Sequence, residues 1–202
     1  MGAGPGFLAS YARQRRPDLR WIASDLLVAP WNDVAADAQQ LPFGDGSFDA
    51  LLGVDVLHHL THINSFFTES ARILKPGGRI SLAEPWVTPL SYPVYRWLHQ
   101  EGCTLSIDPW HPFAESAKDP WEGDAAVPWR LVRDTGEARW RELGLGPPRV
   151  APMNAFAYLF TLGFRNASLL PRRLTPALLW LDRRSRALAS LLGLRVLLSW
   201  IR

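Results

Sequence analysis

The residues that point most directly to chemistry are three glycines near the start of the chain, Gly2, Gly4 and Gly6, spaced as G-x-G-x-G. Residues 7–16 follow them, and their apolar spacing predicts a helix. Glycines in a turn before a helix let the backbone approach a ligand with no side chain in the way. The helix N-terminus adds unpaired N–H groups and a partial positive charge. The pattern therefore predicts a nucleotide-type binding site.

Acidic side chains follow the short apolar segments that we expect to form strands. In a sheet of parallel strands, ligands bind beyond the carboxyl ends of the strands. Any one such acid would be an ordinary solvated loop residue, but four at successive strand ends indicate a shared site. We expect these carboxylates to meet beside the glycine turn; they are Asp25, Asp37, Asp55 and Glu84.

Two adjacent histidines follow the apolar run at residues 48–57. Because imidazole titrates near neutral pH, His59 is a candidate general base, with Asp55 as the alternative. A structural role for the histidine pair stays open. Spaced Cys/His clusters and a Ser-His-Asp order are both lacking, so no metal site and no catalytic triad are predicted. The candidate substrate contacts are His58, Glu84, Trp86 and His99, and the cap also offers Glu101 and His111.

The elements that must position these residues alternate between strands and helices. Short strands are predicted at residues 19–23, 33–36 and 79–83, and a strand buried on both faces at residues 48–57. A helix is predicted at residues 62–74, ended by a glycine turn at residues 75–78. This alternation predicts an α/β fold with a doubly wound, mostly parallel, Rossmann-like sheet.

The composition changes after Trp86. Residues 87–130 are rich in Pro, Trp and His and are expected to form a cap over the strand ends. Helices are predicted at residues 137–143 and 176–192, a strand or irregular stretch at 149–159, and a final antiparallel strand at 194–201. We therefore divide the chain into a binding core, residues 1–86, and a cap or substrate region, residues 87–202, that completes the same domain.

The charge is distributed unevenly along the 202 residues. Residues 1–129 carry a net charge of −6, whereas residues 130–202 carry +9. A solvated basic face on the last helices explains this, and a surface for an anionic partner such as a lipid headgroup is the alternative. No recognition helix or aromatic-basic patch indicates nucleic-acid binding. The single cysteine, Cys103, and the lack of a leader pattern favour the cytoplasm.

The order of these motifs resembles the class I S-adenosylmethionine-dependent methyltransferases, in particular the small-molecule branch similar to ubiquinone and menaquinone biosynthesis enzymes. The resemblance covers residues 1 to about 86. The LPF and LKPGG elements, in this order and spacing, make it specific, since the glycine pattern alone is shared with dinucleotide enzymes. The motifs are GAGPG, DAQQLPF from Asp37, FDALLGVDVLHHL from Phe48 and ILKPGG from Ile73.

The resemblance implies S-adenosyl-L-methionine as the cofactor and a role for each matching residue. The turn formed by Gly2, Ala3, Gly4 and Gly6 would pass along the methionine and ribose parts. Asp25 would accept hydrogen bonds from the ribose hydroxyls. Asp37 and the Ala38 N–H would face the adenine, and Asp55 and Val56 would lie beside the sulfonium and the incoming acceptor.

Two departures from the family pattern bear on this assignment. The segment between Asp25 and Asp37 is shorter than the usual helix and strand, so a role for Asp25 as a helix cap stays open. In the family a central strand precedes the glycine turn, whereas here Met1 takes the position of that strand's last residue. We expect the first strand to be missing and the native chain to begin roughly 20–40 residues upstream.

The expected function is transfer of a methyl group to O, N or C of a small-molecule acceptor. One alternative is a membrane-lipid or quinone acceptor, with the basic, leucine-rich tail lying peripherally on an anionic membrane. Another is a non-catalytic cofactor-binding or partner-binding protein. The sequence gives no indication of the oligomeric state.

Overall fold

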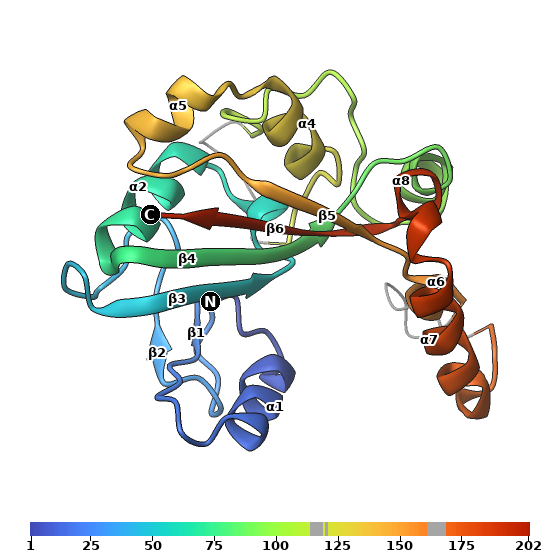
Figure 1. Cartoon of the computed structure of the whole chain (residues 1–202), viewed down its shortest axis with the longest axis horizontal. Helices are drawn as coiled ribbons and strands as arrows, with labels where there is room; N and C mark the ends of the chain where they lie inside the picture. Colours follow the sequence, from blue (N-terminus) through green and yellow to red (C-terminus); the bar gives the residue numbers. More distant parts are fainter. Residues whose placement is uncertain (114–118, 120, 161–168) are drawn as a thin grey trace.

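The computed structural model describes residues 1–113, 119, 121–160 and 169–202 (Figure 1). Its larger sheet has the strand order β3-β4-β6-β5. The strands are β3 (Phe48–Val54), β4 (Leu74–Pro85), β5 (Arg149–Met153) and β6 (Arg195–Ile201). β3 and β4 are parallel, whereas β6 runs antiparallel to β4 and to β5. The α/β fold and the final antiparallel strand are therefore confirmed.

A second, two-stranded parallel sheet pairs β1 (Ser24–Asp25) with β2 (Val34–Ala35). The prediction of a strand at residues 19–23 was wrong, because the pairing with Val34 begins only at Ser24. Residues 1–3 lie between the two sheets. The Met1 amino group donates to Leu52 O at 2.9 Å on β3, and Ala3 N donates to Ser24 O at 3.0 Å on β1. The predicted first helix, α1 (Phe7–Arg15), follows.

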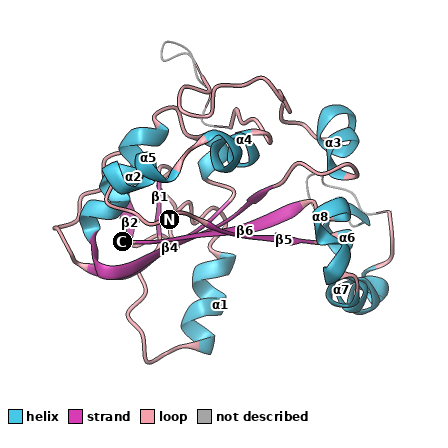
Figure 2. Cartoon of the chain, turned by 45° about the horizontal axis from the view of Figure 1, so that its top comes forward, coloured by secondary structure: helices cyan, strands magenta, loops and turns pink. Residues whose placement is uncertain are grey.

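One face of the larger sheet is covered by helices, as Figures 1 and 2 both show. They are α2 (Ile63–Ile73), α4 (Val127–Asp134) and α5 (Glu137–Glu142). The buried rings of Phe67 on α2, Trp140 on α5 and Trp200 on β6 meet with centroids 5.0–5.5 Å apart. The last strand and the last helix of this layer are thus fastened to α2, which precedes β4.

Two expectations about β3 and β4 need correction. β3 is not buried on both faces: Leu51 and Gly53 are buried, whereas the alternate residues Ala50 and Val54 are exposed, because α2, α4 and α5 cover only one face of the sheet (Figures 1 and 2). Residues 75–78 do not form a helix-ending turn but lie inside β4. The pairing shifts from Phe48–Leu74 to Ala50–Arg79, so the extra residues form a bulge in which Gly77 has a φ of 78°.

The remaining helices are short. The short turn η1 (Leu57–His59) follows β3. The cap contains α3 (Ser91–Pro93) and a π-helical turn η2 (Val94–Leu98). After β5 come α6 (Phe156–Phe160), η3 (Arg172–Leu174), α7 (Thr175–Arg184), η4 (Arg186–Leu188) and α8 (Ala189–Leu192).

The helix predicted at residues 176–192 is broken at Ser185. Asn154 donates its side-chain amide to Ser185 O at 2.6 Å and to Ser185 Oγ at 2.7 Å, and the chain continues from Ser185 as a 3₁₀ turn. A polar anchor from the end of β5 therefore interrupts the helix. In the part of the chain that the structure describes, every helix is too short or too polar to cross a membrane.

Candidate functional site

A large cleft opens at the carboxyl ends of β1, β2 and β3, where the sequence predicts a site. It has a volume of about 1780 Å³. The glycine turn, the cap residues 99–102 and the segment 121–124 form parts of its wall. Ten of the predicted site residues line it: Gly2, Ala3, Gly4, Asp25, Asp37, Ala38, Asp55, Val56, His59 and His99.

The glycine turn needs glycine at each of its three positions. Gly2, Gly4 and Gly6 have φ angles of 60°, 47° and 77°, a region that other residues seldom adopt. A Cβ on Gly2 would lie 2.2 Å from Val56, and one on Gly6 would lie 2.7 Å from Trp31. A Cβ on Gly4 would meet nothing within 4 Å, because this residue faces the open cleft.

Asp25 closes the glycine turn from the other side. Its carboxylate accepts from Gly4 N at 2.8 Å and from Leu27 N at 3.0 Å. The Trp31 indole donates to Gly4 O at 2.6 Å, so the backbone of Gly4 is held at both ends. In this structure Asp25 thus organises the loop that forms one wall of the cleft.

Asp37 and Ala38 line the cleft beyond β2. The Asp37 carboxylate accepts from Gln39 N at 2.8 Å and from the Gln39 side chain at 3.0 Å. Gln39 in turn accepts from His62 N at 2.6 Å through its side-chain oxygen. These bonds tie the segment after β2 to the start of α2 and fix the position of Asp37.

Asp55 follows β3 in a left-handed conformation, with a φ of 54°. Among the described residues it is the only one other than glycine with a positive φ, and such strain concentrates at functional sites. Its carboxylate pairs with Arg195 of β6 at 2.6 Å. Burial opposes the charge of Arg195, but Asp55 outweighs it and raises the pKa of the guanidinium further above its ordinary value. The ion pair thus ties the end of β3 to β6.

Behind this wall, His58 and Glu84 form a buried pair. Glu84 accepts from Val56 N and Leu57 N at 3.0 and 2.9 Å, and its second oxygen lies 2.6 Å from His58 Nδ1. Burial disfavours both charges. The hydrogen bonds of His58 to Glu101 and Glu84 outweigh it and raise the pKa of His58 to about 9. The hydrogen bond with His58, together with those from Val56 N and Leu57 N, likewise outweighs burial and lowers the pKa of Glu84. Neither side chain lines the cleft.

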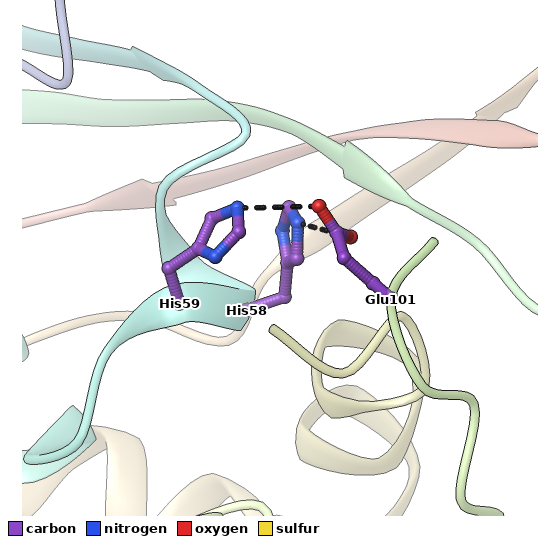
Figure 3. Close-up of side chains that lie close together, drawn as sticks. All are labelled: His58, His59 and Glu101. Atoms are coloured by element: carbon purple, nitrogen blue, oxygen red, sulfur yellow. Dashed lines mark ion pairs between the residues drawn. The ribbon is translucent and has the colours of Figure 1, made fainter. Parts of the chain in front are cut away.

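His59 and Glu101 both line the cleft, and their side chains point toward each other (Figure 3). His59 Nε2 lies 3.6 Å from Glu101 Oε1, and His58 Nε2 lies 3.1 Å from Glu101 Oε2. Burial, and then the charge of His58, lower the pKa of His59. Glu101 is partly buried, but the His58 imidazole lowers the pKa of its carboxyl below the ordinary value.

His99 lies on the cap side of the cleft. Its Nε2 is 3.3 Å from the Tyr158 hydroxyl, and Glu101 N donates to its Nδ1 at 3.2 Å. Burial lowers the pKa of His99. His99 therefore connects the loop that carries Glu101 to α6.

Two other predicted residues lie outside the cleft. Gly6 packs against Trp31. Trp86 packs against the main core, and its backbone N–H donates to Leu194 O at 2.9 Å.

Sequence reasoning missed Trp31, Gly123 and Arg195 and gave Glu101 no specific role. Glu101, Gly123 and Arg195 lie far along the chain from the motifs, and no spacing rule relates them to β3. Trp31 is only 25 residues after Gly6, but nothing in its spacing marks it as a partner of the glycine turn.

Comparisons with known proteins identify sequences and folds that this chain resembles. Residues 1–82 match the family model described as a methyltransferase domain. The chain is 39% identical over 112 residues to 27-O-demethylrifamycin SV methyltransferase of Amycolatopsis mediterranei, covering 55% of this chain and 34% of that protein. It is 50% identical over 116 residues to demethylmenaquinone methyltransferase of Tropheryma whipplei, covering 52% and 48% respectively. The chain thus spans less than half the length of these relatives.

Solved structures support the fold. A SAM-dependent methyltransferase from Archaeoglobus fulgidus superposes with a TM-score of 0.56 at 15% identity, covering 100% of this chain and 83% of that one. A putative methyltransferase from Anabaena variabilis gives a TM-score of 0.52 at 15% identity, covering 100% and 88%. Residues 1–82 are thus similar to the methyltransferase domain family, and the chain as a whole shares the fold of solved SAM-dependent methyltransferases.

Proposed function

We propose that this chain binds S-adenosyl-L-methionine in the cleft and transfers its methyl group to a small-molecule acceptor. The observation that carries the proposal is the convergence of the glycine turn with Asp25, Asp37 and Asp55 in one cleft. These residues come from the carboxyl ends of β1, β2 and β3, where α/β sheets bind nucleotides.

The residues present fit this cofactor. The space beside Gly4 is open, so its backbone can lie against a ligand. We assign the turn at Gly2, Ala3, Gly4 and Gly6 to the methionine and ribose parts. Asp25 is assigned to the ribose hydroxyls, and binding them requires its carboxylate to share or exchange the bond from Gly4 N. Asp37 and Ala38 are assigned to the adenine.

Asp55 and Val56 lie at the end of β3, where we place the reacting end of the cofactor. The sulfonium of the bound cofactor supplies an already activated methyl group. The chain therefore has to position the acceptor and exclude water, and these contributions account for much of catalysis in such reactions.

We place the acceptor against His59 and Glu101, two titratable side chains on the wall beyond Asp55. Asp55 is engaged by Arg195 and is therefore the weaker candidate for taking up an acceptor proton. His99 and Trp121 line the same part of the cleft and are proposed to contact the acceptor.

The division into residues 1–86 and 87–202 describes, in this proposal, two contributions to one domain. Residues 87–202 supply β5 and β6 to the larger sheet and also supply His99 and Glu101 to the cleft. The cap region thus both completes the core and shapes the acceptor side. We also propose a cytoplasmic location, because Cys103 is buried and unpaired, as is usual in a reducing compartment.

A lipid-borne acceptor, such as a quinone, is the second candidate. α7 has no buried residue, and it exposes Leu179, Trp180 and Leu181 beside Arg183 and Arg184. Exposed apolar and aromatic side chains next to arginines suit the surface of an anionic membrane.

The test is a transfer assay with labelled S-adenosylmethionine and two acceptor sets, soluble phenols and long-chain hydroquinones in anionic vesicles. We expect a methylated product that is lost in Asp25→Ala. If the acceptor is lipid-borne, Trp180→Asp reduces transfer in vesicles and leaves transfer to a soluble analogue unchanged. Cofactor binding without transfer to any acceptor would instead favour a non-catalytic cofactor-binding protein.

A further inference from the structure

One cluster of ligating atoms in the described part of the chain borders the cleft and is formed by His58, His59 and Glu101. Figure 3 shows both imidazole rings side by side, with Glu101 reaching toward them from the cap. The ring centroids of His58 and His59 are 4.1 Å apart. One ligand atom from each of the three residues lies within 4.8 Å of the other two. Two nitrogens and a carboxylate from separate parts of the chain therefore converge.

The opposite nitrogen of each ring is already engaged. His58 Nδ1 lies 2.6 Å from Glu84 Oε2, and His59 Nδ1 lies 3.0 Å from the Glu122 carbonyl oxygen. Both acceptors favour a proton on Nδ1, so Nε2, the nitrogen that faces Glu101, is the one that would bind a metal ion after giving up its own proton. A carboxylate or a backbone carbonyl behind each ring is the arrangement found around metal-bound histidines.

A third segment holds this arrangement in place. Gly123 lies flat against both rings: a Cβ there would be 2.8 Å from His59 Nδ1 and 3.0 Å from His58 Cδ2. Asp124 N donates to His58 O at 3.1 Å, and Ala125 N donates to Gly102 O at 2.8 Å. The segment after Gly123 thus connects the histidine turn to the loop that carries Glu101.

We propose that His58 Nε2, His59 Nε2 and the Glu101 carboxylate bind one divalent transition-metal ion of the Zn²⁺ type. Two imidazoles and one carboxylate suit such an ion better than Mg²⁺ or Ca²⁺, which prefer oxygen ligands. Ligands about 2.1 Å from a tetrahedral ion are about 3.4 Å apart. The two Nε2 atoms lie 3.1 and 3.6 Å from the Glu101 oxygens, so a small side-chain shift closes the site. The sequence gives no metal-binding spacing because the third ligand comes from the cap.

The metal would face the place assigned to the acceptor. His59 and Glu101 line the cleft, so the coordination position opposite the buried His58 is open to it. Three protein ligands with one open position are typical of catalytic rather than structural zinc. A hydroxyl bound there would lose its proton more readily. This role rests on the proposed methyltransferase function, whereas the binding of the ion does not.

The experiment is a calorimetric titration of metal-free protein with Zn²⁺, combined with elemental analysis and the visible spectrum of the Co²⁺ form. His59→Ala and Glu101→Gln each remove one ligand at a partly exposed position. The matched control is His111→Ala, because His111 is exposed and pairs only with Asp108 among the contacts described. We expect one ion per chain in the wild type and in the control. Replacing a residue behind a ligand costs about 10–100-fold in affinity, and each ligand variant should lose at least about 100-fold.

Absence of stoichiometric binding to the wild type would overturn the proposal, as would equal affinities in both ligand variants and the control. In that case a proton on His58, shared between Glu84 and Glu101, explains the cluster. Titration of the same samples with S-adenosylhomocysteine keeps the two proposals separate. Cofactor binding without metal binding defeats the metal site alone, and metal binding without cofactor binding defeats the proposed function alone.

Discussion

At the scale of single residues, the buried Glu84 explains why the loop after β3 has a defined shape. Its carboxylate accepts two backbone N–H bonds and pairs with His58. A sequence reading identifies Glu84 as an acid at a strand end but cannot tell whether it faces the ligand or supports the loop. Both outcomes put an acid at the same position, and only the register of β4 against β3 decides between them.

Replacing Glu84 with alanine should therefore destabilise the fold. The change leaves the N–H groups of Val56 and Leu57 and the His58 imidazole without their buried acceptor. We expect a loss of about 3–5 kcal/mol in the free energy of unfolding, as for other broken buried ion pairs. Urea unfolding of the wild type and Glu84→Ala measures it.

The control for this prediction is Glu137→Ala, which breaks an exposed ion pair with Arg141 on α5. Such pairs contribute less than about 1 kcal/mol. Equal destabilisation by the two changes would show that the buried hydrogen bonds of Glu84 do not stabilise the fold as predicted.

At the scale of elements, the apolar patterns in the sequence predicted α1, α2, α5, β2 and β6 closely. In each case the pattern spans nearly the same residues as the element. It failed where a distant contact determines the backbone. Ser185 breaks a continuous helical pattern because Asn154 binds it. The glycines at residues 77–78 look like a helix end but form a bulge, because the parallel pairing of β4 with β3 begins at Leu74.

The bulge in β4 makes a prediction of its own. Gly77 has a φ of 78°, and a Cβ there would meet nothing within 4 Å. Gly77→Ala should therefore cost only the conformational penalty of about 1–2 kcal/mol. Thermal and urea unfolding measure this loss.

Gly44→Ala is the matched control for the bulge, because Gly44 also has open space around its Cα but lacks a positive φ. This change should be neutral or stabilising by up to about 1 kcal/mol. If Gly77→Ala proved as stable as Gly44→Ala, the bulge conformation would be wrong.

At the scale of the whole molecule, the cleft draws on parts of the chain that share no sequence motif. The glycine turn, Asp25, Asp37 and Asp55 could be placed together from the sequence, because parallel strands bring their carboxyl ends to one edge. Glu101, Gly123 and Arg195 could not, since their positions depend on how the cap and β6 fold back over that edge. The side of the cleft that we assign to the cofactor was therefore predictable, and the side that we assign to the acceptor was not.

The central claim is that the assembled cleft binds the cofactor, and calorimetric titration of the 202-residue chain with S-adenosylhomocysteine tests it most directly. We predict one site per chain with micromolar affinity, at least about 10-fold weaker in Gly4→Ala, whose left-handed backbone faces the cleft. At 100-fold excess over the dissociation constant the ligand should also stabilise the fold by about 2.7 kcal/mol. No detectable binding to the folded chain, or binding that Gly4→Ala leaves unchanged, would contradict the assignment of this cleft.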